Sequence, residues 1–137
     1  MSKILYSAEE KISVDEFASV LTRSTLSERR PMDSPETLQA MLENADVLVT
    51  ARDDRGLLVG ISRALTDFIF CTYLSDLAVD KDFQGLGIGK ELIHRTHARC
   101  GLQTQLILIA APGAESYYPH VGLRPHQSCW IVDRKPT

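Results

Sequence analysis

The chain has 137 residues, of which 44% are hydrophobic and 24% charged, so its length is that of one ordinary domain. This composition excludes a disordered chain and a membrane-embedded one. The net charge is -3, from 15 basic and 18 acidic residues. A general nucleic-acid binder carries a basic excess instead. We therefore expect a single domain over residues 1–137, with neither a nucleic acid nor a membrane as partner.

The cysteines favour free thiols over cross-links. Cys71, Cys100 and Cys129 are odd in number and far apart, whereas disulfide frameworks and zinc sites need dense or closely paired cysteines. We interpret them as buried thiols in a reducing compartment. Residues 1–10 lack the apolar run of a signal peptide, and the longest apolar stretch, residues 106–112, is too short for a bilayer. These features predict a cytoplasmic protein.

Two helices are predicted in the first third of the chain. Ser13 and Glu16 have capping-box spacing, and Ser34 precedes Pro35 as an N-cap precedes the first helical residue. Apolar residues then recur at intervals of three and four. The side chains expected to be buried are Val14, Phe17, Val20 and Leu21 in the first helix and Leu38, Met41 and Leu42 in the second.

The middle of the chain predicts an antiparallel meander. Apolar and β-branched residues mark strands at residues 46–52, 57–65 and 68–79, and polar turns separate them. An amphipathic helix at residues 86–100 ends at Gly101, whose missing side chain suits a helix C-terminus.

The last third of the chain predicts a strand that is buried on both faces. Residues 105–111 form a continuous apolar run, typical of a central strand covered on both faces. Together with the preceding strand and helix, this run makes a βαβ unit, so the two strands should be parallel. A short helix at residues 114–120 and a final strand at residues 129–132 complete an α/β fold.

The segment between the third strand and the following helix is the most informative. Gly85, Gly87 and Gly89 alternate there. Glycine lets the backbone approach a ligand closely, and a helix N-terminus presents free N–H groups with a partial positive charge. This combination indicates a site for phosphate or pyrophosphate.

Two common phosphate loops do not fit this segment. A Walker A loop requires glycine at the position of Gln84 and serine or threonine at that of Glu91. The dinucleotide fingerprint requires a third glycine where Lys90 or Leu92 stands.

The pattern that fits is Gln/Arg-x-x-Gly-x-Gly/Ala, met by Gln84, Gly87 and Gly89. On this pattern the chain resembles the GNAT family of acetyl-CoA-dependent N-acetyltransferases. The preceding Leu77-Ala78-Val79 and the predicted order of elements extend the resemblance over nearly the whole chain.

The resemblance implies a fold and a cofactor site. The fold is a mixed, mostly antiparallel sheet flanked by helices, with a central parallel strand pair that splays apart. Backbone groups of Leu77 and Val79, with Ala78 between them, would pair with the pantetheine arm of acetyl-CoA, because a free strand edge offers donors and acceptors. The residues implied to hold the pyrophosphate are Gln84, Gly85, Leu86, Gly87, Ile88, Gly89 and Lys90.

The resemblance also implies a proton donor. Residues 116–123 resemble the family's Phe-Tyr-x-x-x-Gly-Phe segment, with Tyr117 and Leu123 in place of the phenylalanines. Tyr118 then stands at the position of the general acid that protonates the coenzyme A thiolate. A phenol with a pKa of about 10 suits that task. Packing beside the cofactor is the alternative for Tyr118, and core packing is expected for Tyr117.

A proton acceptor for the amine is less well marked. Asp76 is an acidic residue in an otherwise apolar strand beside the expected cleft, which makes it the candidate base. A structural role for Asp76, a base at Tyr73, Glu115 or His120, and a water relay remain open.

Other polar residues give weaker signals. His94 and His97 lack a third ligand, so no metal is expected. Arg29 and Arg30 lie between the first two helices, where the resemblance would let them contact an acidic acceptor, although a solvated loop is the alternative.

We therefore expect an N-acetyltransferase that transfers the acetyl group of acetyl-CoA to a primary amine, by direct attack in a ternary complex. The 19 residues after Tyr118 favour a small-molecule acceptor and a homodimer that completes its pocket. A non-catalytic acyl-CoA-binding module on the same fold is the alternative function. Transfer onto charged tRNA is disfavoured by the acidic composition.

Overall fold

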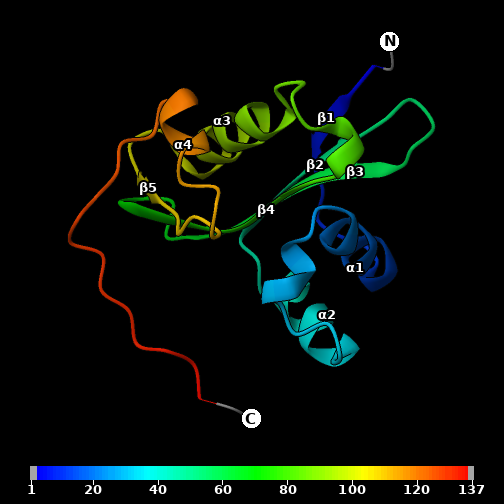
Figure 1. The fold of residues 1–137 in the computed structure, drawn as a ribbon, viewed down its shortest axis with the longest axis horizontal. Helices are drawn as coiled ribbons and strands as arrows, with labels where there is room; N and C mark the ends of the chain where they lie inside the picture. The colour runs from blue at the N-terminus through cyan, green and yellow to red at the C-terminus, as the bar shows by residue number, and fades with distance from the viewer. Residues whose placement is uncertain (1–2, 136–137) are drawn as a thin grey trace.

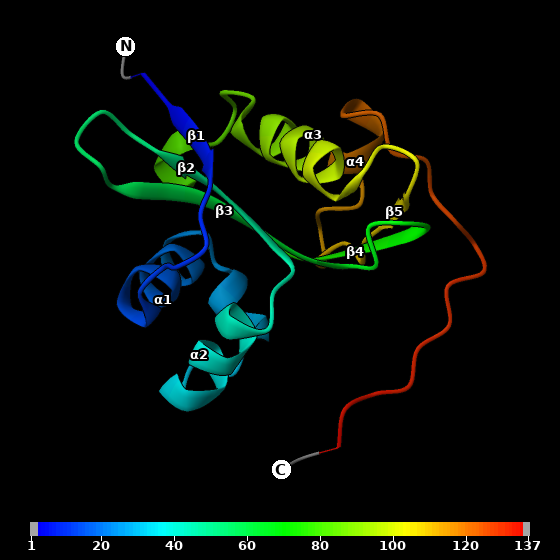
Figure 2. The same cartoon turned by 180° about the vertical axis from the view of Figure 1, so that it is seen from behind.

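The computed structural model describes residues 3–135 and contains a five-stranded sheet between two layers of helices (Figures 1 and 2). The strands are β1 (Leu5–Ala8), β2 (Val47–Arg52), β3 (Leu58–Thr66), β4 (Cys71–Val79) and β5 (Gln105–Ile107). They lie side by side in chain order, antiparallel except for the parallel pair β4 and β5. The expected mixed, mostly antiparallel sheet with one parallel pair is confirmed.

The first two helices begin where the sequence predicts, whereas the third begins two residues and the fourth three residues later than expected. They are α1 (Val14–Arg23), α2 (Pro35–Glu43), α3 (Ile88–Cys100) and α4 (Tyr117–His120), with 3-10 turns η1 (Leu26–Arg29) and η2 (Lys81–Phe83). The Ser13 and Ser34 side chains accept the backbone N–H of Glu16 and Thr37, so both N-caps are formed.

The two helical layers bury separate apolar clusters. The helices α1 and α2 cover one face through Phe17, Leu21 and Leu38, which are at most 1% exposed. The helix α3 covers the other face through Ile88 and Leu92 (Figure 2). Burial of this apolar surface drives the packing of the helices on the sheet.

Several expected boundaries are wrong because contacts distant in sequence decide them. The edge strand β1 was not expected; it pairs with β2, and the nearby Glu9 carboxylate accepts Arg52 Nε at 3.0 Å. Residues 68–70 form a turn, because the Asp67 carboxylate accepts the N–H groups of Ile69, Phe70 and Cys71.

The apolar run at residues 105–111 is not a central strand covered on both faces. Only its first three residues form β5, which lies at the edge of the sheet with Ile107 57% exposed. The expected strand at residues 129–132 is likewise absent, and these residues are exposed coil. All three cysteines are free as expected, but only Cys100 is buried.

A β-bulge interrupts β4 at the centre of the sheet. Arg63 of β3 is opposite Asp76, whereas the next residue of β3 is opposite Leu74, so Ser75 is the additional residue. Bulges bend a strand and disturb its pairing. The parallel pairing with β5 accordingly covers only Cys71–Tyr73 and ends just before the bulge.

Two arginines hold this bulge through the buried carboxylate of Asp76. Arg30, just after η1, donates from Nε to Asp76 Oδ1 at 2.6 Å and from Nη2 to the Ser75 carbonyl at 2.8 Å. Arg63 donates from Nε to Asp76 Oδ2 and from Nη2 to Ser75 Oγ at 3.0 Å. We call this cluster of Arg30, Arg63, Ser75 and Asp76 the Asp76 clamp. It ties the chain between α1 and α2 to the bulged strand.

The Asp76→Asn variant should lower the free energy of unfolding by about 3 kcal/mol, because it leaves the buried guanidinium of Arg63 and the half-buried one of Arg30 without a counter-charge. Urea unfolding measures this change. The matched control is Asp54→Asn, in the exposed turn between β2 and β3. Equal stability of the two variants would contradict the role of the clamp.

Candidate active site

Within residues 3–135, no strand pairs with one edge of β4 along the second half of that strand. The strand pairs with β3 up to Val79 but with β5 only up to Tyr73. Asp80 N–H donates to Val59 C=O at 2.8 Å, which fixes the alternation of the antiparallel ladder. The backbone N–H and C=O groups of Ala78 therefore face β3, whereas those of Leu77 and Val79 face the free edge. This edge can pair with an extended ligand.

The glycine loop leads from this strand into α3. Gly85 and Gly87 have φ of +80° and +82°, values that residues with a side chain rarely adopt. Gly87 caps α3, and the first helical bond runs from Glu91 N–H to Gly87 C=O at 3.1 Å. The N–H groups of Ile88, Gly89 and Lys90 thus have no acceptor within the helix. With the partial positive charge of the helix end, they suit an anion.

Several contacts fix the position of this loop. The helix α3 packs closely on the sheet, since a Cβ at Gly60 of β3 would lie 3.0 Å from Leu92 Cδ1. At the start of the loop, the Asp80 carboxylate accepts the N–H of Asp82 and pairs with Arg23 of α1. Gln84 Nε2 donates to the Val79 carbonyl at 3.2 Å. The loop is therefore held against the end of β4.

The two tyrosines of α4 lie beside the first turn of α3. The rings of Tyr117 and Tyr118 meet edge to face, with centroids 5.2 Å apart. A Cβ at Gly89 would lie 2.4 Å from Tyr117 Oη, so the absent side chain makes room for this hydroxyl. Tyr117 is 37% exposed, which makes it a contact of the loop more than a core residue.

Burial raises the pKa of Tyr118 above its ordinary value of 10, and the neighbouring Tyr117 raises it further. The phenol therefore keeps its proton at neutral pH, as a general acid must. Among residues 3–135, the Tyr118 hydroxyl makes no hydrogen bond that would occupy it.

Asp76 does not lie in this opening as a free carboxylate. Its side chain is 0% exposed, and each carboxylate oxygen accepts a guanidinium N–H. A general base must reach the proton that it removes. This geometry gives Asp76 a structural role in the Asp76 clamp, which is the alternative that the sequence left open beside its role as the base. Arg30 is likewise neither solvated nor free for an acidic acceptor.

The arginine partners of Asp76 were not identified from sequence. Arg63 lies in the middle of a strand of mostly apolar residues, 13 positions before Asp76, and it is 7% exposed. Opposite charges on consecutive buried strands were the available signal, since a buried charge requires a partner.

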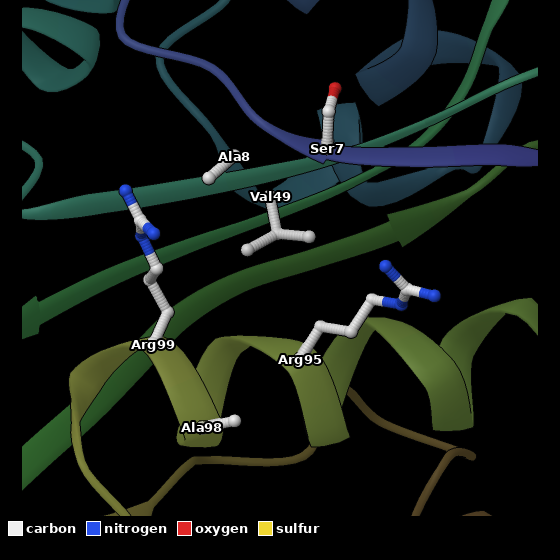
Figure 3. A pocket seen from close by; sticks show the side chains of 6 residues that line it. All are labelled: Ser7, Ala8, Val49, Arg95, Ala98 and Arg99. Carbon is white, nitrogen blue, oxygen red and sulfur yellow. The ribbon is translucent and has the colours of Figure 1, made fainter.

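A shallow hollow of about 340 Å³ lies elsewhere, between β1, β2 and α3 (Figure 3). It is lined by Ser7, Ala8, Val49, Arg95, Ala98 and Arg99. Arg95 is already engaged there by Glu91 at 2.6 Å and by the ring of Tyr6. None of the expected site residues lines this hollow.

We also searched the described residues for metal-binding clusters and for membrane-spanning helices. Residues 3–135 bring no three His, Cys, Asp or Glu side chains together in a way that could hold a metal ion. Over the same residues, none of the helices combines the length and apolar composition needed to cross a membrane.

Comparison of the sequence with known proteins identifies one family. The model of the acetyltransferase (GNAT) domain matches residues 9–132. The uncharacterized N-acetyltransferase ycf52 of Pyropia yezoensis is 30% identical over 99 residues, which are 69% of this chain and 55% of that protein. The ycf52 protein of Porphyra purpurea is 34% identical over 77 residues, 55% of this chain and 44% of that protein. The chain thus spans about half the length of the curated relatives it matches.

Solved structures share the fold at lower identity. The aminoglycoside N-acetyltransferase AAC(6')-Iy, solved in complex with CoA, superposes with a TM-score of 0.73 over 99% of this chain and 97% of its own, at 15% identity. The GNAT family N-acetyltransferase YhbS from Escherichia coli, also in complex with CoA, gives 0.68 over 89% and 69%, at 17% identity.

The domain match covers most of the chain, and the sheet, the glycine loop and the α4 tyrosines occur in the order that the resemblance implied. The chain therefore belongs to the GNAT family of acetyltransferases.

Proposed function

We propose that this chain transfers the acetyl group of acetyl-CoA to a primary amine, by direct attack in a ternary complex. The observation that carries the proposal is the free edge of β4 at Leu77 and Val79, which leads directly into the open N-terminus of α3. The bound CoA of two proteins with this fold supports it. The proposed acceptor is a small molecule, and the proposal includes the cytoplasmic location and the homodimer expected from the sequence.

The proposed cofactor site uses backbone groups more than side chains. The amides of the pantetheine arm would pair with Leu77 and Val79 as an added strand, with Ala78 bonded to β3 behind them. The pyrophosphate would accept N–H groups from residues 84–90, where the glycines have no side chain of their own. This arrangement explains how a chain of net charge -3 can bind an anionic cofactor.

In the proposed reaction, the neutral amine attacks the thioester carbonyl carbon. The new C–N bond forms as the C–S bond breaks, and Tyr118 donates its proton to the departing thiolate. The amine proton leaves through water, because the carboxylate of Asp76 is enclosed by two arginines. A water chain then restores the proton of Tyr118.

Gly87→Glu should abolish acetyl-CoA binding, because it adds bulk and a negative charge where the pyrophosphate would lie. Gly87→Ala is the matched control, since it imposes the same strain at φ of +82° without charge and should bind more weakly but measurably. Calorimetry with acetyl-CoA measures both. Wild-type affinity in Gly87→Glu would refute the assignment of the loop.

Tyr118→Phe should lower kcat by about 100-fold or more while the Kd of acetyl-CoA changes little, because only the proton donor is removed. Thiol release across a panel of amines identifies the acceptor and measures kcat. Tyr6→Phe makes the same change on β1 and should keep full activity.

The pH profile tests the same assignment. Because the pKa of Tyr118 is raised, its ionisation should lower kcat only above pH 10. Unchanged kcat in Tyr118→Phe would assign the residue to packing. No thiol release with any amine, despite tight acetyl-CoA binding, would favour the non-catalytic binding module.

A further inference from the structure

Asp80 lies at the junction between β4 and the glycine loop. It follows Val79, the last residue of β4, and precedes η2 as its N-cap. The residue is 5% exposed, so its carboxylate is largely removed from water. A buried carboxylate is costly unless a cation and hydrogen-bond donors surround it. The partners of Asp80 therefore bear on how the chain leaves the sheet and enters the loop.

Asp80 uses its backbone and its side chain to form the turn towards the loop. Its N–H donates to the Val59 carbonyl at 2.8 Å, and its own carbonyl accepts the N–H of Phe83 at 2.9 Å. One carboxylate oxygen, Oδ1, accepts the N–H of Asp82 at 2.9 Å. These bonds direct the chain out of the sheet. The path of the loop thus begins at Asp80.

The counter-charge of Asp80 is Arg23, in the last turn of α1. Arg23 Nη1 donates to the second carboxylate oxygen, Oδ2. Nη2 of the same guanidinium donates to the Leu58 carbonyl at 2.7 Å, and Nε donates to Ser19 Oγ at 3.1 Å. The guanidinium is therefore fixed by α1 and by β3 at once. It can hold Asp80 in one position relative to the sheet.

The loop that follows has few contacts of its own. A Cβ at Gly85 or Gly87 would meet no atom within 4 Å, so among residues 3–135 only chain neighbours lie close on that side. Glycine also has more backbone conformations open to it than other residues. Gln84 adds one hydrogen bond, from Nε2 to the Val79 carbonyl at 3.2 Å. The position of the loop therefore depends on its two ends, the turn at Asp80 and the start of α3.

Two arginines fasten the chain after α1 to two points along β4. Arg30 binds Asp76 at the bulge. Arg23 binds Asp80, just after the end of the strand. Residues 77–79, whose edge would pair with the pantetheine arm, lie between these two points. The Asp76 clamp thus holds the strand edge, whereas the pair of Arg23 and Asp80 holds the entrance to the glycine loop.

We propose that Arg23 is a positioning residue for the pyrophosphate of acetyl-CoA and acts through Asp80. It fixes the turn from which the loop presents its N–H groups, and it does not itself touch the cofactor. This role rests on the proposed cofactor site and divides it into two separately held parts. Loss of Arg23 should disturb the part that binds the pyrophosphate and spare the part that pairs with the pantetheine arm.

Arg23→Met removes the guanidinium and keeps an unbranched apolar side chain. It should raise the Kd of acetyl-CoA by about 10-fold or more, because a loop that is no longer held in its binding geometry binds weakly. Arg23→Lys retains the positive charge and should give an intermediate Kd. The matched control is Arg52→Met, since Arg52 ties the first turn of α1 to the sheet through Glu16 and makes no contact with Asp80. Calorimetry should give this control the Kd of the wild type.

A double-mutant cycle tests whether Arg23 acts through Asp80. Asp80→Asn should also raise the Kd of acetyl-CoA, and the double variant should raise it no further than the more damaging single change. Effects that multiply would show that the two residues act independently, which refutes the proposal. Circular dichroism verifies that each variant is folded, and Arg23→Lys carries the same cycle should Arg23→Met fail to fold.

Amide NMR spectra at saturating acetyl-CoA locate the effect within the site. In Arg23→Met, the shifts that binding induces at residues 85–89 should differ from those of the wild type, whereas those at residues 77–79 should match. Changes of equal size at both places would show a general disturbance of the sheet and refute the proposal, as would a wild-type Kd in Arg23→Met. A wild-type chain that does not bind acetyl-CoA contradicts the proposed cofactor site itself, and with it this role of Arg23.

Discussion

The separation of β4 from β5 depends on one buried ionic interaction, the Asp76 carboxylate between Arg30 and Arg63. This clamp holds Ser75 out of register, and pairing with β5 ends two residues earlier, at Tyr73. The free edge at Leu77 and Val79 follows from that interruption. Arg63 is buried and Arg30 half-buried around this carboxylate, and Ser75 and backbone carbonyls accept further N–H groups of both arginines. The proposed cofactor site is thus a consequence of how β4 is bent.

Local sequence signals predicted the helices and the glycine loop. They did not predict which strands pair, because that pairing depends on residues distant in sequence. Ser13, Ser34 and Pro35 act within their own turn, so their sequence context determines the cap. β1 is held by β2, which lies more than 40 residues away, and the four residues of β1 carry no pattern of their own. The apolar run at residues 105–111 predicted a covered strand, because composition does not distinguish a buried strand from one whose apolar surface is exposed at an edge.

The candidate site likewise has features that the sequence predicted and features that it did not. The glycine loop was predictable because positive φ and free N–H groups are properties of a short segment. The role of Asp76 was not, because the bulge at Ser75 shifts its partner on β3 and places Arg63 opposite it. The position of Tyr117 was not predicted either, because its hydroxyl lies over Gly89, which is distant in sequence. Residue type identified the chemistry available, and tertiary contacts decided which groups remain free to use it.

The shortness of β5 leaves backbone groups open on both of its sides. A strand of three residues cannot cover β4, so within residues 3–135 the backbone beyond Tyr73 has no strand partner on this side, although the Val79 carbonyl accepts Gln84 Nε2. The same short strand is the last of the sheet and leaves its own outer side open. Exposed backbone groups are satisfied by whatever extended chain reaches them, whether a cofactor arm or a peptide. The inner opening lies beside the positive end of α3 and therefore suits an anionic ligand, whereas the outer opening lies beside apolar side chains. Surrounding charge and apolarity thus distinguish the two openings on either side of β5.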